Sequence, residues 1–159
     1  SKRYKNAFVI SSSEVLQTMI DGDVAELRSV KASRFSIAFK EEIDSLEQKL
    51  FQITEVVDSI LGVQLKWMFA ENVFLSGAKD IQDQLSQEYK LFLQVNEEFA
   101  DALETIHNNP STLMVSSSDT FMKMKVMDKS LESIKKGLEH YMELKQTKFP
   151  KVFSSTQLE

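Results

Sequence analysis

The sequence predicts an all-α protein, an elongated bundle of long amphipathic helices. Four Gly and two Pro among 159 residues supply too little turn chemistry for an all-β protein with many hairpins. A hydrophobic fraction of 42% is enough for a packed core and excludes a disordered acidic tail. Apolar residues also recur with a helical period over three long stretches of the chain.

Residues 1–34 are expected to form short helices that lead into the bundle. Ser11 and Glu14 have the spacing of a capping box, which predicts a short helix over residues 12–20. The sequence Asp21-Gly22-Asp23 is expected to break that helix, after which spaced apolar residues indicate another turn or two.

The second element carries the strongest periodic signal in the chain. Its apolar stripe has a period of about 3.5 residues over about four heptads, typical of a helix packed lengthwise against partners. The members of the stripe are Phe39, Ile43, Leu46, Leu50, Ile53, Val57, Ile60, Gln64 and Trp67. The predicted helix covers 35–73 and is roughly 60 Å long at about 1.5 Å per residue. Gly62 is the one position where a bend is expected.

Two further helices are predicted after an interruption at Ser76-Gly77. The first has a break near Ser86 and ends at Asn108-Asn109-Pro110-Ser111, because Pro cannot continue a helix. A polar connector then leads to Asp119 as the N-cap of the last helix. The last stripe consists of Met124, Met127, Leu131, Ile134, Leu138 and Tyr141, and the pairs Glu132–Lys136 and Lys135–Glu139 are expected to be ion pairs on its exposed face.

No catalytic, cofactor-binding or metal-binding residue is predicted. The absence of Cys excludes disulfides, iron–sulfur clusters, Cys-based zinc sites and a thiol nucleophile. The four glycines, at 22, 62, 77 and 137, form no phosphate-binding loop. His107 and His140 lack the spacing of a zinc site and are assigned to a helix end and to the surface or its boundary. Adjacent carboxylates such as Glu41-Glu42 and Glu97-Glu98 diverge on a helix and are expected to be solvated.

Two other residue sets are assigned to the core rather than to a binding site. Met122, Met124 and Met127 have helical spacing within an apolar stripe, which favours core packing over a soft-metal site or a promiscuous groove. Trp67 continues the buried stripe, which favours the core over an interface anchor. The net charge of −5 disfavours binding to nucleic acid. No apolar run approaches the length of about 18 residues that would span a membrane.

Several short motifs occur in a fixed order from Trp67 onward. They are Trp67-Met68-Phe69-Ala70-Glu71-Asn72-Val73-Phe74, then Asp80-Ile81, Gln84-Leu85-Ser86, Glu88, Phe92 and Val95-Asn96, and finally Lys136-Gly137-Leu138, Tyr141-Met142-Glu143, Lys145-Gln146 and Phe149-Pro150-Lys151. In order and spacing they resemble the linker region of dynein heavy chains, with its W-x-Y-L-E-x-I-F, D-I-x-x-Q-L-P and K-G-L-x-x-Y stretches. The resemblance covers roughly residues 9–153. Departures from the family pattern include Ala70, Ser86, Leu46 and Ile60.

The resemblance implies a mechanical role rather than catalysis. The chain would be a helical linker-like segment over 35–153, with 154–159 as a tail or cloning remnant. In such a motor the linker is the lever that couples ATP hydrolysis in the AAA+ ring to minus-end-directed movement on microtubules. The implied partners are the AAA+ ring and the remaining linker of the same heavy chain, with other dynein subunits contacted indirectly. No nucleic acid, membrane or direct microtubule contact is expected, and the implied location is cytoplasmic and cytoskeletal, with an axonemal class favoured.

Two alternatives stay open at this point. A free-standing helical adaptor or scaffold with a linker-like fold would also show long stripes and no active site. A helical enzyme is disfavoured because no convergent polar constellation is visible. If the chain is a lever, its flexing is expected at the connectors near Ser76-Gly77 and 108–118, where breaker residues gather.

Overall fold

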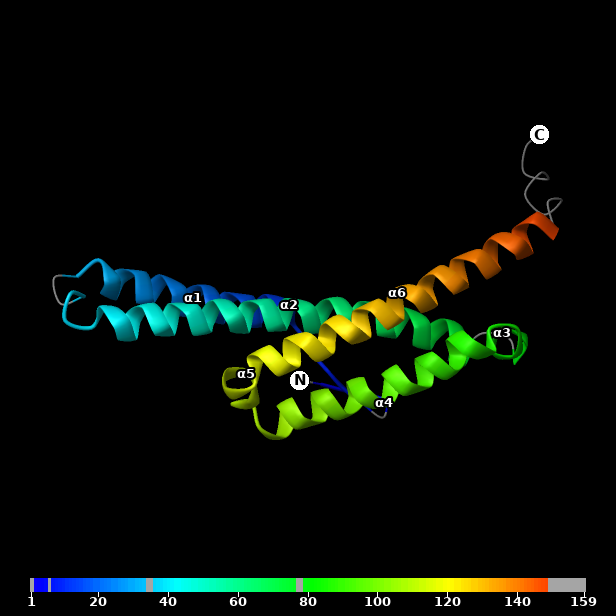
Figure 1. Ribbon diagram of the computed structural model, residues 1–159, viewed down its shortest axis with the longest axis horizontal. Coiled ribbons are helices and arrows are strands. Elements are labelled where there is room, and N and C mark those ends of the chain that lie inside the picture. The colour runs from blue at the N-terminus through cyan, green and yellow to red at the C-terminus, as the bar shows by residue number, and fades with distance from the viewer. Residues whose placement is uncertain (1, 6, 34–35, 77–78, 149–159) are drawn as a thin grey trace.

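The computed structural model describes residues 2–5, 7–33, 36–76 and 79–148. It is an elongated, almost wholly helical bundle, which confirms the all-α prediction (Figure 1). Within the described residues the elements are β1 (Lys2–Tyr4), β2 (Ala7–Val9), α1 (Ser13–Lys31), α2 (Lys40–Ser76), α3 (Lys79–Gln84), α4 (Ser86–Asn108), α5 (Thr112–Val115) and α6 (Ser117–Lys148). None of these helices is both long and apolar enough to cross a membrane.

The chain begins with a β-hairpin rather than with helix alone. Strands β1 and β2 pair antiparallel, with Arg3 opposite Phe8, and Lys5 takes a left-handed φ of 50° between them. Ala7 and Val9 point into the core of the bundle. Three-residue strands are too short to show a period of two, so the sequence pattern did not indicate them.

Helix α1 corrects the expectation of short helices before residue 34. It is one helix of 19 residues that runs through Gly22 without a break. Its N-cap is Ser12, not Ser11, because the Ser12 hydroxyl accepts a hydrogen bond from the Val15 N–H at 3.4 Å. A glycine inside a helix costs about 1 kcal/mol relative to alanine. Packing of α1 against α2, with Leu27 buried, outweighs that cost.

The remaining helices follow the predicted order, with corrected boundaries. Helix α2 covers Lys40–Ser76, against the predicted 35–73, and Gly62 does not interrupt it. The break near Ser86 is confirmed, as is the end of α4 before Pro110. Helix α6 begins at Ser117, so Asp119 lies in its first turn and is not its N-cap. A carboxylate in the first turn still stabilises the helix through its dipole.

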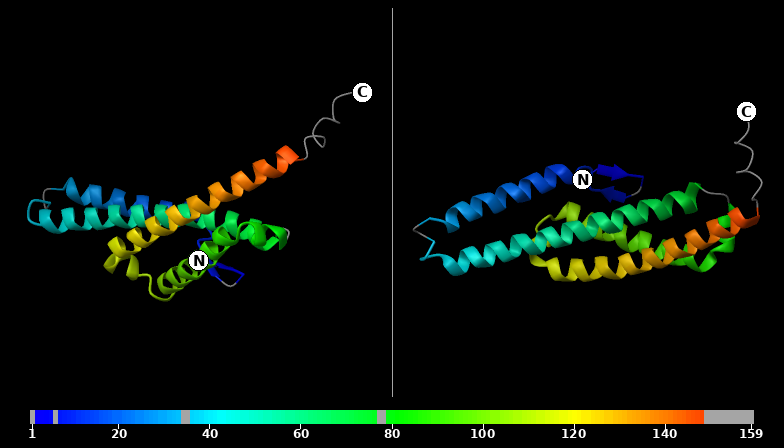
Figure 2. Two further views of the ribbon diagram at one scale, coloured as in Figure 1. Left: turned by 45° about the vertical axis from the view of Figure 1, so that its right-hand side comes forward. Right: turned by 90° about the horizontal axis from the view of Figure 1, so that it is seen from above.

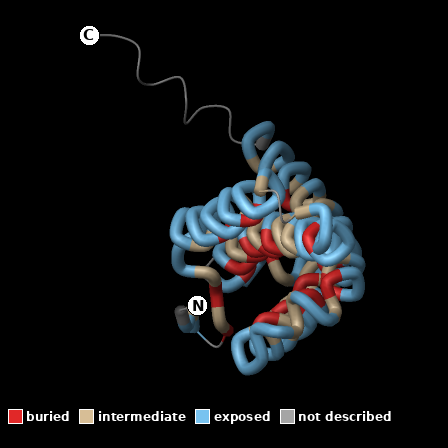
Figure 3. The backbone as a smooth tube through the Cα atoms, turned by 90° about the vertical axis from the view of Figure 1, so that its left-hand side faces the viewer, coloured by how far each residue is buried: buried red, intermediate tan, exposed pale blue. Residues whose placement is uncertain are grey.

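The core lies where α2, α4 and α6 run side by side (Figure 2). Buried residues face inward along these three helices, as the end-on view shows (Figure 3). The α6 stripe is buried from Met124 to Leu138, and Tyr141 is half-buried. The prediction that Met122 belongs to the core is wrong, since its side chain is 62% exposed.

The long stripe of α2 is continuously buried only in its second half, and in its first half Ile43 is buried between exposed neighbours of the stripe. From Val57 to Trp67 it faces α4 and α6, whereas Phe39 and Leu46 remain exposed. The reason is visible in Figure 1, where the first half of α2 projects beyond the bundle with α1 beside it. One neighbouring helix covers a narrower face than a bundle does, so part of the apolar stripe stays exposed.

Candidate functional site

The motif residues that lie far apart in the sequence meet in one aromatic cluster between α2 and α4. Phe74 and Phe92 are both fully buried, with ring centroids 5.4 Å apart. Tyr89 packs on Phe74 at the same centroid distance of 5.4 Å. Aromatic pairs at this spacing add about 0.5–1.5 kcal/mol beyond the area that they bury. The cluster therefore fixes α2 against α4.

Trp67 lies at the centre of the next layer. Its side chain is 3% exposed, and its ring lies 5.4 Å from that of Phe99 on α4. The indole Nε1–H donates a hydrogen bond of 2.8 Å to Asn96 Oδ1. Tyr4 of the hairpin meets the indole edge-on at 6.1 Å. The prediction of Trp67 as a core residue is confirmed, and its one polar atom is paired.

Helix α6 passes closely over α4 at Gly137. A Cβ atom at position 137 would lie 2.9 Å from Glu88 Cγ, so the motif glycine leaves room for the Glu88 side chain. Beyond it, Asp80 of α3 accepts hydrogen bonds from Lys145 at 3.1 Å and from Tyr141 at 3.4 Å. The Lys145 hydrogen bond holds the pKa of the Asp80 carboxyl below its usual value. These contacts tie the last turns of α6 to α3 and α4.

The β-hairpin is clamped onto α2 by polar contacts. Gln64 binds the backbone of Ile10 twice, accepting from its N–H at 3.0 Å and donating to its C=O at 3.3 Å. Lys5 donates to the carboxylate of Glu71, a hydrogen bond that raises the pKa of the Lys5 amine. Glu71 is buried, and its Oε2 atom has no hydrogen-bond partner among the described residues. The hairpin also contacts α4, because the Phe8 ring stacks on the His107 ring with their centroids 4.0 Å apart.

A lysine network joins α2 to α6. Lys66 contacts Asp128 at 2.7 Å and Glu132 at 3.0 Å. Hydrogen bonds to Asp128 and Glu132 raise the pKa of Lys66, and Lys66 in turn lowers the pKa of Glu132. The predicted partner of Glu132, Lys136, is therefore replaced by a residue of another helix. The predicted pair Lys135–Glu139 is present at 3.9 Å.

The predicted absence of a catalytic centre stays a prediction. His107 stacks on Phe8 at the end of α4, while His140 is exposed on α6. Within the part of the chain that the structure describes, no group of three His, Asp or Glu side chains is arranged to hold a metal ion. The contacts described above hold α2, α4, α6 and the hairpin together at several positions along the bundle.

Sequence reasoning did not identify the residues that clamp these parts together. Gln64 carried a signal, since it is the one polar member of an apolar stripe, and such a residue has to find a partner when it is buried. Lys5 and Lys66 carried none, because their partners lie on other elements and no local pattern links them.

Comparison with known proteins gives one consistent answer. The family model for "Dynein heavy chain, N-terminal region 2" matches residues 1–155. The chain is 32% identical over 151 residues to the dynein-1-beta heavy chain of the flagellar inner arm I1 complex from Chlamydomonas reinhardtii, covering 94% of this chain and 3% of that protein. It is 38% identical over 144 residues to human dynein axonemal heavy chain 2, covering 88% and 3%. Human dynein axonemal heavy chain 12 is 30% identical over 146 residues, covering 91% and 5%. The chain thus spans only a small part of the length of each of these relatives.

Proposed function

The chain belongs to the dynein heavy chain family, within its N-terminal region 2, and from this membership we propose that it is a segment of the linker, the lever that couples ATP hydrolysis in the AAA+ ring to minus-end-directed movement on microtubules. The segment is the N-terminal region of a heavy chain and not the ATPase ring, so it is not itself catalytic. The motor activity belongs to the whole heavy chain.

The observation that supports a lever is the packing of the second half of α2 along α6. The two helices have 37 and 32 residues, or about 55 Å and about 48 Å at about 1.5 Å per residue. Bending such a pair requires its core side chains to separate, and close-packed interiors resist this. The Lys66 network adds ion pairs to the same contact, and the hairpin clamp adds hydrogen bonds between α2 and the hairpin. Flexing is expected instead at the connectors between helices.

The proposed partners are other parts of the same motor. A lever has to contact the AAA+ ring and the rest of the linker, whereas other dynein subunits would be reached indirectly. The relatives are named as axonemal and flagellar heavy chains. These names support the proposal that the chain works in a cytoskeletal motor of the axoneme.

The test is to soften the lever inside the full heavy chain. Phe74→Ala removes a fully buried ring, a change that costs about 3–5 kcal/mol in a core. Microtubule gliding velocity and ATP turnover are then measured on the same preparation. A lever predicts slower gliding at nearly unchanged ATP turnover, because hydrolysis continues while its displacement is lost.

The matched control is Phe69→Ala, the same deletion on the same helix at a side chain that is 43% exposed. It should leave velocity and turnover close to those of the wild type. If Phe74→Ala lowers gliding and ATP turnover in equal proportion, or changes neither, the segment does not act as a lever.

A further inference from the structure

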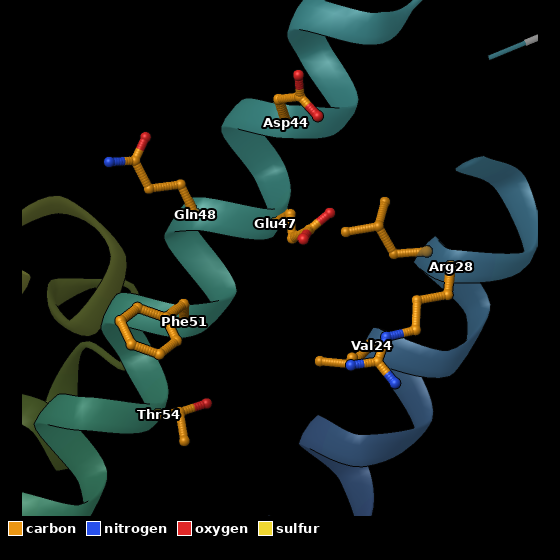
Figure 4. Close-up of a pocket in the computed structure, with 8 residues that line it drawn as sticks. Val24, Arg28, Asp44, Glu47, Gln48, Phe51 and Thr54 are labelled. Atoms are coloured by element: carbon orange, nitrogen blue, oxygen red, sulfur yellow. The ribbon is translucent and has the colours of Figure 1, made fainter. Parts of the chain in front are cut away.

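The projecting pair of helices α1 and α2 leaves two grooves open along its sides. Both grooves share Leu27 of α1 but take different residues of α2. The first is lined on the α2 side by Asp44, Glu47 and Phe51, among others, with Val24 and Arg28 facing them from α1 (Figure 4). The second lies along the other side of the helix contact and encloses about 440 Å³.

The two grooves differ in charge. In the first groove the carboxylates are neutralised within the chain, since Lys31 contacts Glu47 at 3.0 Å and Asp44 at 3.6 Å, and Arg28 is part of the lining. The second groove has three carboxylates and no Lys or Arg in its lining, and Lys49 on the same stretch of α2 does not line it. We call this second groove the acidic groove; it is lined by Asp23, Glu26, Leu27, Val30, Glu42, Ile43, Leu46 and Leu50.

The floor of the acidic groove is apolar and partly uncovered. Val30 of α1 is 47% exposed, and Leu46, at a position where the long stripe of α2 predicts burial, is 44% exposed. None of the three rim carboxylates takes part in an ion pair within the described residues. An apolar floor with unpaired charges of one sign along its rim is typical of a surface that receives a partner of the opposite sign.

From this juxtaposition we propose that the acidic groove receives an amphipathic helix with Lys or Arg beside its apolar stripe, supplied by the same heavy chain outside this segment. A helix fits because the groove runs between two helices, where a third one can pack ridges into grooves. The basic flanks would pair with Asp23, Glu26 and Glu42. This inference rests on the proposed function, since it assigns the surface by which the lever joins its neighbouring part.

The observations favour that occupant over others. A second copy of this chain docked groove to groove would bring the same carboxylates against each other, and like charges in an interface oppose association. An anionic membrane surface is disfavoured for the same reason. The matched relatives extend far beyond this segment, which covers 3–5% of their length. A helix on the same polypeptide has a high effective concentration at the groove, so modest contacts are enough to hold it.

The experiment places a photo-crosslinking amino acid at Leu46 in the purified full-length heavy chain. Mass spectrometry of the cross-linked peptides then identifies the residue that it touches. The proposal expects a peptide of the same heavy chain, outside residues 1–159, with Lys or Arg beside its apolar residues. A cross-link only to a separate subunit, to a second heavy chain or to no peptide at all would overturn it.

A charge reversal tests the electrostatic part. Glu26→Lys combined with Glu42→Lys should lower the cross-link yield by roughly tenfold, because the basic flanks then meet like charges. The matched control is Glu97→Lys with Glu104→Lys, which changes the net charge equally at two exposed positions of α4. Equal yields from the two variants would contradict the proposal. Gliding velocity and ATP turnover of the Phe74→Ala motor test the lever itself. A missing cross-link in a motor that passes that test refutes only the docking surface.

Discussion

Replacing Trp67 should be among the most damaging single changes to the stability of this chain. The indole is 3% exposed and lies between Phe99 and Tyr4, so it joins α2 to both α4 and the hairpin. Trp67→Ala should lower the free energy of unfolding by about 3–5 kcal/mol, the range for deleting a large aromatic side chain from a core. For a chain of this size that corresponds to a fall in melting temperature of roughly 6–20 °C.

A second substitution separates packing from hydrogen bonding. Trp67→Phe keeps an aromatic ring but removes the Nε1–H that donates to Asn96 Oδ1 at 2.8 Å. Because Asn96 is only half-buried, water can replace the donor. The lost hydrogen bond should therefore cost about 1 kcal/mol, and the smaller ring about as much again.

The assay is urea unfolding of the chain followed by far-ultraviolet circular dichroism, since Trp67 is the only tryptophan and its fluorescence is lost in both variants. Phe51→Ala is the control, because that ring on the same helix is 63% exposed and its loss should change the free energy by no more than about 0.5 kcal/mol. The expected order of destabilisation is Trp67→Ala, then Trp67→Phe, then Phe51→Ala. If Trp67→Ala costs no more than Phe51→Ala, the packing derived for this core is wrong.

Three further predictions concern the helices and the clamp. Gly22→Ala should stabilise the chain by about 1 kcal/mol in urea unfolding, because the added methyl group meets nothing within 4 Å apart from its own stretch of helix and alanine favours helix. Gly137→Ala should gain less or lose stability, since its methyl group meets Glu88. An equal gain at both sites would contradict the close approach of α6 to α4. Gln64→Ala leaves the Ile10 N–H and C=O without their partner, which should lower the free energy of unfolding by about 1–3 kcal/mol. Hydrogen exchange at the Ile10 amide should accelerate, and unchanged exchange would show that other contacts hold the hairpin. Lys66→Met should destabilise the chain at neutral pH. Because Lys66 lowers the pKa of Glu132 from 4.5, the difference in unfolding free energy from the wild type should be full above that pH and shrink as the pH falls through the lowered pKa. A free-energy difference that stays constant with pH would refute this network.

The long helices could be predicted because their signal is local and repeated. The stripe from Met124 to Leu138 follows one face of a helix, and burial of that face is what the pattern encodes. The break near Ser86 and the end before Pro110 are also local properties of the chain. In these cases propensity, periodicity and packing agree, so the sequence alone was sufficient.

The errors occurred where tertiary contacts decide the outcome. Gly22 has the composition of a breaker, yet α1 continues through it because α2 supports the helix on both sides of that position. Met122 belongs to the same apolar run as Met124 and Met127, but its side chain is 62% exposed at the edge of the contact between α6 and α4. The contacts that clamp the hairpin to α2, such as Gln64 with Ile10, join residues 54 positions apart. No local pattern in the chain can indicate a pairing of that kind.

The measurement that tests the central claim most directly is the position of this segment in a working motor. A fluorophore on an unnatural amino acid placed at Glu97, an exposed site of α4, is paired with a second fluorophore in the AAA+ ring of the full heavy chain. Single-molecule energy transfer is then recorded with and without ATP during microtubule gliding. The account predicts at least two distances that interchange with the nucleotide state. One distance in every nucleotide state of a motor that still glides would contradict it.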